Sequence, residues 1–319
     1  MKLKIRIASR KSKLALCQVE ILKSYFDLGI ETEILEVITS GDQILNKSLS
    51  EIGGKGLFIK ELEKFILDGS ADIAVHSMKD METEIAQNTV HSMKDMETEI
   101  AQNTTISAVL PRGDRSDVLL GKYSTLDDLP YNAVIGTSSV RRAAFTKSYR
   151  PDLVIKLLRG NVETRIQKLE DGLFDAIILA KAGLDRLKIN VGKQIPSDIM
   201  PPAATQGAIA IQSTTNRNNK YEKDLNNYLF NINDNETYFE TLAERSLLKT
   251  LDGSCRSPIS ASAYIIENDR LKLYGAIARL DGTKVVKSEI VGLKKDAVLL
   301  GKNLGTEILS KANGEIIYK

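Results

Sequence analysis

The strongest constraint on the fold is an alternation of short strand patterns with amphipathic helix patterns, which begins near the N-terminus. Residues 3–7 alternate apolar with basic side chains, as a half-buried strand does. Ser12 can cap the helix that follows, and further strands are predicted at about 32–39 and at 71–77, with a helix at 57–69 between them. Strands that alternate with helices are typical of a mainly parallel sheet.

The same alternation restarts near residue 133, which predicts a second α/β unit. Beyond about residue 235 the pattern changes to one long helix, three consecutive strands and a last helix, the strands at 259–266, 270–280 and 284–292 and the helix at about 295–311. Strands that run together without helices between them indicate a separate α+β domain. We therefore expect an α/β fold class with two α/β domains and a third, smaller α+β domain.

A perfect tandem duplication complicates the length of 319 residues. Residues 75–89 read VHSMKDMETEIAQNT, and residues 90–104 repeat the same fifteen letters. A structural repeat needs units of about 20–50 residues and at least three of them, so this is an insertion into a fold encoded by the other 304 residues. Both histidines, His76 and His91, lie inside it, which argues against a multi-histidine metal site and weakens any histidine-based nucleophilic mechanism.

Composition excludes several classes of partner. With 44 basic and 42 acidic side chains the net charge is +2, which gives no support for a nucleic-acid-binding surface. Two cysteines cannot form a disulfide framework and favour a reducing compartment. No stretch approaches the ~18 apolar residues of a membrane span, and the N-terminus lacks the apolar core of a signal peptide. We expect a cytoplasmic protein.

Arginines recur where the predicted strands end. Arg10 follows the first strand, and GTSSVRR places Arg141 and Arg142 in the first turn of a helix. A helix N-terminus attracts anions, so two arginines there oppose the helix dipole unless an anion lies between them. In LRGNVETR, Arg159 and Arg165 flank another helix start, which Asn161 can cap.

Open α/β sheets bind ligands at the carboxyl ends of their strands. A guanidinium group binds a carboxylate through two parallel hydrogen bonds, so the predicted ligand carries several carboxylates or phosphates. Neither GxGxxG nor GxxxxGK[ST] is present, which disfavours a nucleotide. The alternative is that these arginines are solvated surface residues.

The sequence around two further residues suggests that their side chains take part in chemistry. Asp80 follows the buried strand at 71–77 and is suited to stabilising a developing cation, although a capping or surface aspartate is the alternative. Cys255 lies in the tight turn DGSCRSP, where Arg256 favours the thiolate of a nucleophile or attachment point; a small buried residue is the alternative. Phe58 fits either a core or a cleft.

Together these segments resemble the porphobilinogen deaminase family, also called hydroxymethylbilane synthase. The resemblance spans essentially the whole chain, through RIASRKSKLAL, GGKGLFIKELE, DIAVHSMKD, VLPRGDRSD, IGTSSVRRA, LRGNVETR, DAIILAKAGLDRL and LDGSCRSPI. It implies that the first two domains resemble periplasmic binding proteins. It also implies a transferase that joins four porphobilinogen units into the linear tetrapyrrole hydroxymethylbilane, with release of ammonia, in haem biosynthesis.

The resemblance also implies roles for individual residues. Cys255 would carry a dipyrromethane cofactor through a thioether, and Asp80 with Lys79 would stabilise positive charge on pyrrole nitrogens and assist proton transfer. The residues implied to hold the cofactor are Lys79, Thr137, Ser138, Ser139, Arg141, Arg142 and Arg159. Those implied to bind the substrate are Arg10, Ser12, Gln18, Phe58, Arg165 and Arg186. No metal is implied, and a monomer is expected.

The expected domain boundaries follow the motifs. The first domain covers residues 1–112 together with about 206–230, and the second covers 113–205. The third, residues 231–319, carries the cysteine.

The chain departs from the family pattern in two places. Thr205 stands where the family usually has glycine, and the duplication repeats the Lys79–Asp80 pair as Lys94 and Asp95. The letters ADIA before the first copy continue a buried strand, whereas AQNT before the second copy is polar. We therefore expect the first copy to occupy the site and about fifteen residues to loop out before Thr104, at a cost on the order of 1 kcal/mol.

Three alternatives remain open at this stage. A duplication beside the cleft could leave the chain inactive. A non-catalytic, two-lobed anion-binding protein would share the arginines but would have no use for Asp80 or Cys255. A cysteine hydrolase would need a histidine base, which is lacking outside the repeat.

Overall fold

The computed structural model describes residues 4–43, 58–81, 103–215, 220–253 and 257–313. The chain divides into two compact units. The first contains the described residues within 1–44, 54–112 and 208–238, and the second contains those within 113–207 and 239–319. The expected division into three domains stays a prediction.

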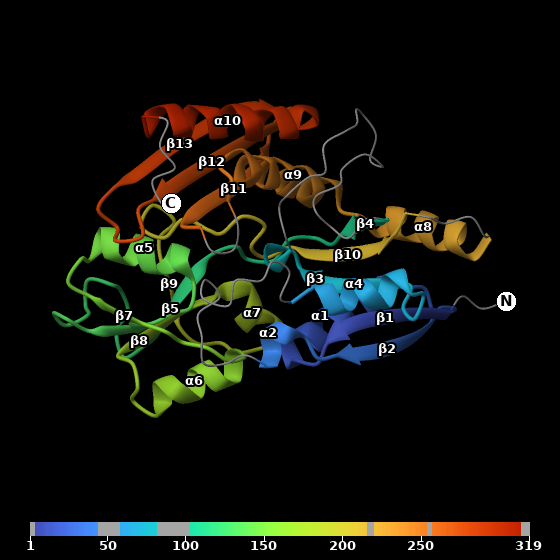
Figure 1. The fold of residues 1–319 in the computed structure, drawn as a ribbon, viewed down its shortest axis with the longest axis horizontal. Coiled ribbons are helices and arrows are strands. Elements are labelled where there is room, and N and C mark those ends of the chain that lie inside the picture. Colours follow the sequence, from blue (N-terminus) through green and yellow to red (C-terminus); the bar gives the residue numbers. More distant parts are fainter. Residues whose placement is uncertain (1–3, 44–57, 82–102, 216–219, 254–256, 314–319) are drawn as a thin grey trace. The chain divides into compact units, whose positions relative to one another are not determined.

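The first unit is built on a five-stranded sheet in the order β2-β1-β3-β10-β4 (Figure 1). Its strands are β1 (Lys4–Arg10), β2 (Glu31–Val37), β3 (Ile73–Ser77), β4 (Thr104–Val109) and β10 (Ile209–Thr214). β1 runs parallel to β2 and β3, while β10 runs antiparallel to β3 and β4. The mainly parallel sheet is confirmed; the antiparallel strand β10 was not predicted.

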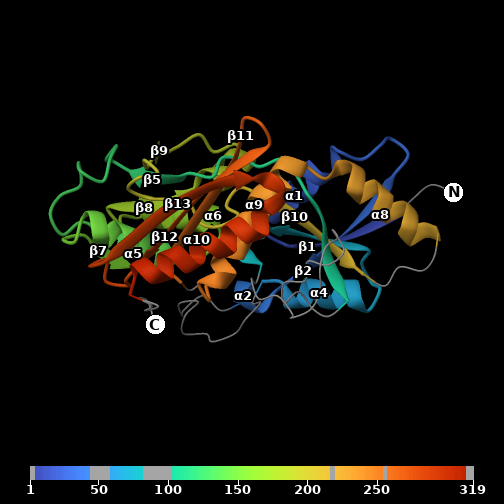
Figure 2. The same ribbon diagram turned by 90° about the horizontal axis from the view of Figure 1, so that it is seen from above.

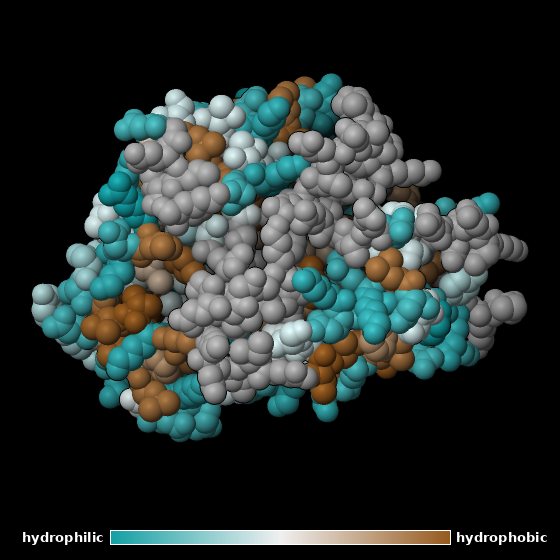
Figure 3. Space-filling model, in the orientation of Figure 1, coloured by the Kyte–Doolittle hydropathy of each residue, from teal (hydrophilic) through white to brown (hydrophobic). Residues whose placement is uncertain are grey.

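Helices cover both faces of this sheet because successive strand residues point to opposite sides. Ile7 and Ile73 pack on one face with residues of α1 (Lys13–Lys23) and α8 (Lys220–Ile232). Ala8 and Ala74 pack on the other face against Leu62 and Ile66 of α4 (Lys60–Leu67). The outward side of α4 forms a hydrophilic surface in Figure 3, as expected of an amphipathic helix.

The second unit repeats this strand order in a sheet arranged β7-β6-β8-β5-β9. Its strands are β5 (Asp117–Gly121), β6 (Val134–Gly136), β7 (Val154–Lys156), β8 (Ala176–Ala180) and β9 (Lys193–Gln194). β6 is parallel to β7 and β8, and β5 is antiparallel to its neighbours. Its helices are α5 (Val140–Tyr149), α6 (Val162–Glu170) and α7 (Lys181–Arg186).

The second unit also contains a three-stranded antiparallel sheet. Its strands are β11 (Ile259–Ile266), β12 (Arg270–Ala278) and β13 (Val285–Leu293), and its helices are α9 (Asn235–Thr250) and α10 (Ala297–Lys311). Figure 2 shows α10 lying along β12 and β13. A Cβ added to Gly301 of α10 would lie 2.4 Å from the carbonyl oxygen of Ala243, so glycine allows α10 to approach α9 closely. The α/β class with a smaller α+β part is confirmed.

The first copy of the duplication forms structure at the centre of the first unit. It supplies Val75–Ser77 of β3 and the 3-10 turn η1 (Met78–Asp80). β4 begins at Thr104, which is the last residue of the second copy. Residues 82–102, and with them Lys94 and Asp95, lie outside the described part of the chain. Among the described helices, none is long and apolar enough to cross a membrane.

Thr205, which stands where the resemblance implies glycine, has a main-chain conformation that favours glycine. Its φ of +58° lies in the left-handed region, which is costly for a β-branched residue. The residue is 2% exposed, and its N–H donates to Glu244 Oε2 at 2.6 Å. The hydrogen bond to Glu244 therefore helps to hold the main chain in a conformation that the branched side chain of Thr205 disfavours.

We predict that Thr205→Gly raises the free energy of unfolding by about 1 kcal/mol, because glycine adopts this φ without steric conflict. Thr205→Ala is the matched control, since it removes the hydroxyl and methyl but keeps the Cβ, and it should give no such gain. Urea unfolding of the three proteins measures the difference. A less stable glycine variant would contradict the explanation.

Candidate active site

Two neighbouring parallel strands of the first unit deliver predicted site residues to one edge of its sheet. β1 and β3 are paired at Ile7 with Ile73 and at Ala8 with Ala74, and both strands run in the same direction. Arg10 ends β1, and Lys79 and Asp80 follow β3 in η1. This edge is the carboxyl end of both strands, where open α/β sheets bind ligands.

The turn that carries Lys79 and Asp80 is anchored on both sides. Met78 donates its N–H to the carbonyl oxygen of Ala208 at 3.1 Å, and the N–H of Met81 donates to the carbonyl oxygen of Met78 at 3.1 Å. The side chains of Met78 and Met81 are 3% and 2% exposed, whereas Lys79 and Asp80 are half-buried. The methionines therefore fix the turn while the two charged residues keep access to solvent.

Ser12 and Gln18 belong to α1 beside this edge. Ser12 caps the helix as predicted, because its Oγ accepts the N–H of Ala15 at 3.3 Å. Gln18 is 2% exposed and donates Nε2 to Ser77 Oγ at 2.7 Å. Gln18 therefore holds α1 against the end of β3.

Arg10 is held by an ion pair and by an aromatic ring. Its guanidinium group pairs with Asp42 of α2 (Ser40–Gln43), and its Cζ atom lies 4.4 Å from the centre of the Phe58 ring. Asp42 Oδ2 also accepts the hydroxyl of Thr39 at 2.7 Å. Burial would raise the pKa of Asp42, but the hydrogen bond and charge of Arg10, with the bonds from Thr39, hold that pKa below its usual value. Phe58 therefore contacts a predicted site residue.

His76 lies on β3 within the electrostatic reach of Arg10. It is 5% exposed, and its Nε2 has no hydrogen-bond partner among the described residues. Burial, together with the charge of Arg10, lowers the pKa of His76 to about 4, against the opposing effect of Gln212. The ring is therefore neutral near pH 7, as a structural histidine would be.

The second unit gathers its predicted site residues in the same way, at the carboxyl ends of the parallel strands β6, β7 and β8. The residues that follow these strands are Thr137, Ser138, Ser139, Arg141, Arg142, Arg159, Arg165 and Arg186. Ser139 caps α5 through an Oγ that accepts the N–H of Arg142 at 3.3 Å, and the N–H of Ser139 donates to Thr137 Oγ1 at 3.1 Å. Thr137 and Ser139 therefore shape the start of α5, and Ser138 between them is half-buried.

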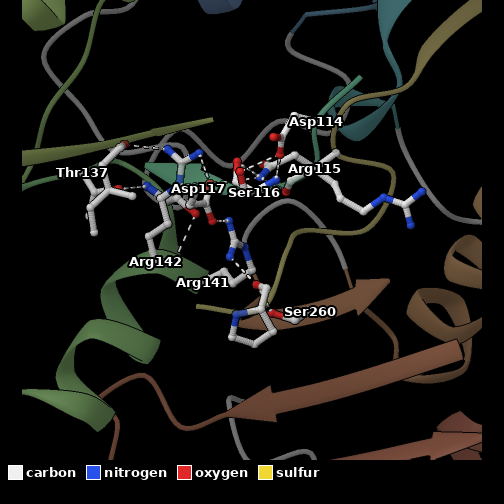
Figure 4. A network of polar contacts seen from close by, with 12 residues as sticks. Asp114, Arg115, Ser116, Asp117, Thr137, Arg141, Arg142 and Ser260 are labelled. Carbon is white, nitrogen blue, oxygen red and sulfur yellow. Dashed lines mark hydrogen bonds and ion pairs between the residues drawn. The ribbon is translucent and has the colours of Figure 1, made fainter. Parts of the chain in front are cut away.

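An anion does lie between Arg141 and Arg142, and it is the carboxylate of Asp117 (Figure 4). Arg141 Nη2 donates to Asp117 Oδ2 at 2.6 Å, and Arg142 donates from Nε and Nη2 to Oδ1 at 3.1 and 2.8 Å. Gln206 Nε2 donates to the same Oδ1 at 3.0 Å. The sequence predicts a bound ligand as the anion between the two arginines, whereas the anion found there is a carboxylate of the chain itself.

Backbone carbonyls complete this cluster. Arg141 Nη1 donates to the carbonyl oxygen of Pro201 at 2.5 Å, and Arg142 Nη1 donates to that of Ile178 at 2.8 Å. The exposed fractions of Arg141, Arg142 and Asp117 are 4%, 6% and 0%. Burial would raise the pKa of Asp117, but the charges of Arg141 and then Arg142 hold that pKa well below its usual range.

The cluster keeps an excess of positive charge. Two guanidinium groups face one carboxylate, and Arg141 Nε is buried with no hydrogen-bond partner among the described residues. A buried charge is unfavourable unless an opposite charge compensates it. The cluster, at the N-terminus of α5, therefore suits an additional anionic group.

The other predicted arginines have internal contacts as well. Asn161 caps α6 as predicted, accepting the N–H of Thr164 at 2.8 Å, and Arg165 Nε donates to the carbonyl oxygen of Gly160 at 2.8 Å. Arg159 is 6% exposed. Arg186 Nη2 donates to the carbonyl oxygen of Gly207 at 2.5 Å, which ties α7 to the segment before β10.

Cys255 lies outside the described residues, but the chain on both sides of it is anchored. The N–H of Gly253 donates to the carbonyl oxygen of Leu248 at 2.8 Å, and the N–H of Ile259 donates to that of Ser257 at 2.8 Å. Within the described ranges, no group of three or more histidine, cysteine, aspartate or glutamate side chains is arranged to hold a metal ion.

These features define a class of protein before any comparison is made. Two α/β units each collect arginines and hydroxyl groups at the carboxyl edge of a mainly parallel sheet, and one edge adds a lysine–aspartate pair. Arginines gathered at the carboxyl ends of parallel strands are typical of the class of α/β proteins that bind anionic ligands there.

Comparison with known proteins identifies the family. The model "Porphobilinogen deaminase, dipyromethane cofactor binding domain" matches residues 5–89 and 84–222, and "Porphobilinogen deaminase, C-terminal domain" matches residues 238–310. The first two matches overlap in the first copy of the duplication and together span both copies. The chain belongs to the porphobilinogen deaminase family.

Individual relatives agree with this assignment. A porphobilinogen deaminase of Maridesulfovibrio salexigens is 40% identical over 98% of this chain and 97% of its own length. One from Buchnera aphidicola subsp. Acyrthosiphon pisum is 39% identical over 98% of this chain and 95% of its own. Among solved structures, a putative methionine-binding lipoprotein from Bacillus subtilis has a TM-score of 0.38 and 13% identity, covering 72% of this chain and 90% of that one.

As a member of this family the chain is a transferase of tetrapyrrole synthesis. It polymerises porphobilinogen to hydroxymethylbilane and uses a dipyrromethane cofactor.

The buried His76 predicts a pH dependence of stability. The unfolded chain binds a proton on this residue near pH 6.5, whereas the folded chain does so only near pH 4. The free energy of unfolding therefore falls as the pH is lowered from about 6.5 to about 4, by at most about 1.4 kcal/mol per pH unit. In a His91→Gln variant, which leaves one histidine, NMR should show the ring titrating near pH 4. Titration near 6.5 would contradict the burial.

Proposed function

We propose that Lys79 and Asp80 are the catalytic residues and that Cys255 carries the dipyrromethane through a thioether. In this proposal the cofactor is held by Lys79, Thr137, Ser138, Ser139, Arg141, Arg142 and Arg159, and porphobilinogen is bound by Arg10, Ser12, Gln18, Phe58, Arg165 and Arg186. The observation that carries the proposal is that the adjacent parallel strands β1 and β3 bring Arg10 and the Lys79–Asp80 turn to one edge of a single sheet.

Asp80 is the group suited to the chemical steps. An ionised carboxylate beside a pyrrole stabilises the positive charge that develops on the ring nitrogen and accepts or returns a proton there. Arg10 supplies a fixed cation for a side-chain carboxylate of the substrate, which orients the reacting carbon. Once bound, the dipyrromethane supplies the free pyrrole α-carbon that acts as the nucleophile.

The second unit supports the part of the proposal that concerns the cofactor. Arg141 and Arg142 carry two positive charges, and Asp117 compensates only one of them. Arg141 Nε is buried and has no hydrogen-bond partner among the described residues. A dipyrromethane carries acidic side chains and therefore fits this position. Asp117 holds the two guanidinium groups in place, and the capped N-terminus of α5 adds its dipole.

Residues outside the duplication favour the first copy at the site. Ile73 and Ala74, which precede the first copy, are fully buried in β3. Asp72 accepts two hydrogen bonds from Arg6 of β1, one from the main-chain N–H of Arg6 at 2.7 Å and one from its Nη2 at 2.8 Å. If the second copy took this place, Asn88 would replace Ile73 in the core and Gln87 would replace Asp72. Burying an amide there costs several kcal/mol, and the Arg6 contacts would be lost.

The two copies can be separated by mutation. We predict that Asp80→Asn lowers the rate of hydroxymethylbilane formation by about 100-fold or more, because the neutral amide cannot balance the developing charge. Asp95→Asn, the same change in the second copy, should keep the full rate. If only Asp95→Asn abolishes turnover, the site is formed by the second copy; if both variants keep activity, Asp80 is not catalytic.

The attachment point is tested by intact-protein mass spectrometry. The purified protein should be heavier than its sequence by one dipyrromethane unit, and Cys255→Ala should lose that mass because it removes the thioether sulfur. Cys17→Ala is the control and should keep it, since Cys17 lies on α1. An unmodified mass in fresh wild-type protein would favour an inactive chain or a non-catalytic anion-binding protein.

We further propose that the protein works as a cytoplasmic monomer with three domains and without nucleic acid. Its net charge of +2 supports the last point. The others rest on the family expectation and on the composition.

A further inference from the structure

Successive residues of the short helix α2 make contacts that together hold Arg10 in place. Ser40, Gly41 and Asp42 are consecutive, and each touches a different partner. We propose that this Ser40–Asp42 turn is a positioning device that fixes the orientation of the Arg10 guanidinium and so sets the KM for porphobilinogen. The inference rests on the proposed role of Arg10 in binding a carboxylate of the substrate.

Asp42 fixes one edge of the guanidinium group. Its Oδ2 accepts Arg10 Nε at 3.3 Å and its Oδ1 accepts Arg10 Nη2, so both oxygens bind the same side of the fork. The carboxylate is itself anchored, because Oδ2 also accepts the N–H of Thr39 at 3.3 Å and its hydroxyl at 2.7 Å. A bidentate pair with an anchored carboxylate leaves the guanidinium little freedom to rotate.

Phe58 fixes the face of the same group, and Gly41 makes room for Phe58. The guanidinium carbon lies 4.4 Å from the ring centre, within the range of a cation–π contact. A Cβ added to Gly41 would lie 2.2 Å from Phe58 Cε1 and 2.5 Å from Cδ1, so the ring packs directly on the Gly41 backbone. Any side chain at position 41 must therefore displace the ring from this contact.

Ser40 attaches the turn to the body of the first unit. Its N–H donates to Glu61 Oε1 at 2.9 Å, and its hydroxyl donates to the same oxygen. Glu61 belongs to α4, which packs on the sheet through Leu62 and Ile66. The turn therefore takes its position from a helix that is packed on the sheet, and Arg10 takes its orientation from the turn.

This arrangement leaves a defined edge of Arg10 for a ligand. The Nε–Nη2 edge is occupied by Asp42, while Nη1 has no hydrogen-bond partner among the described residues. The Nη1–Nη2 end matches the two oxygens of a carboxylate, as the side edge does. A substrate carboxylate can bind there without displacing Asp42.

The test compares Asp42→Asn and Gly41→Ala with Asp72→Asn. Asp72 is the matched control, because it also forms a bidentate pair with an arginine of β1, Arg6, but outside the proposed site. Asp42→Asn and Gly41→Ala should each raise the KM for porphobilinogen about 10-fold and change kcat by less than about twofold. The dipyrromethane mass should persist in both variants. Asp72→Asn should lower stability and leave KM unchanged, and Asp42→Glu should recover part of the loss.

The outcomes separate the inference from the proposed function. If KM is unchanged in Asp42→Asn and Gly41→Ala, or falls because Asp42 competes with the substrate, the positioning role is wrong. Arg10→Gln tests the underlying role: if it too leaves KM unchanged, Arg10 does not bind substrate, and this part of the proposed function fails together with the positioning role. In the double variant Arg10→Gln/Asp42→Asn the effects should not add, since Asp42 acts through Arg10. Should Gly41→Ala fail to fold, Asp42→Asn and the conservative variant Asp42→Glu still test the positioning role.

Discussion

The arrangement of the second unit depends on one buried carboxylate. Asp117 is fully buried and accepts hydrogen bonds from two adjacent arginines and from Gln206. Without it, two guanidinium groups would remain buried without a counter-charge, a situation that costs about 3–5 kcal/mol when one partner of such a pair is removed. The same carboxylate connects three parts of the chain, because it begins β5, binds the first turn of α5 and holds the segment before β10. The buried arginine pair can therefore stay charged and ordered without a ligand.

The first unit also holds an arginine by a carboxylate of the chain, but nearer to the surface. Arg10 is only partly buried, so its ion pair with Asp42 contributes less to stability, but the pair and the Phe58 ring together define its direction. In both units arginines of the proposed site, namely Arg10, Arg141 and Arg142, are also bound to carboxylates of the chain itself. Each of these three arginines thus has a contact within the chain that sets the geometry of its guanidinium group.

Many of the helices and strands could be predicted from the sequence, because they depend on interactions between residues that are close together in the chain. The strands at 259–266 and the helix caps at Ser12 and Asn161 follow from periodicity and from side chains that bond their own neighbours. What was missed depends on contacts between distant residues. β10 enters the first sheet antiparallel, and Asp117 lies more than twenty residues from the arginines it binds. Asp42 was missed for the same reason, since only the folded turn brings it to Arg10. Residues such as Cys255 lie outside the described part of the chain, so their roles rest on the family.

The duplicated segment lies where it can be removed without loss of a strand. β3 is built from the first copy, and β4 begins with the last residue of the second, so the two strands bracket the extra segment. Because the copies are identical, removing any fifteen consecutive residues that start between positions 75 and 90 produces one and the same shorter protein. Both strands keep every residue in that product. A deletion of one repeat length at any of these positions therefore leaves a chain with a single copy of the Lys79–Asp80 pair.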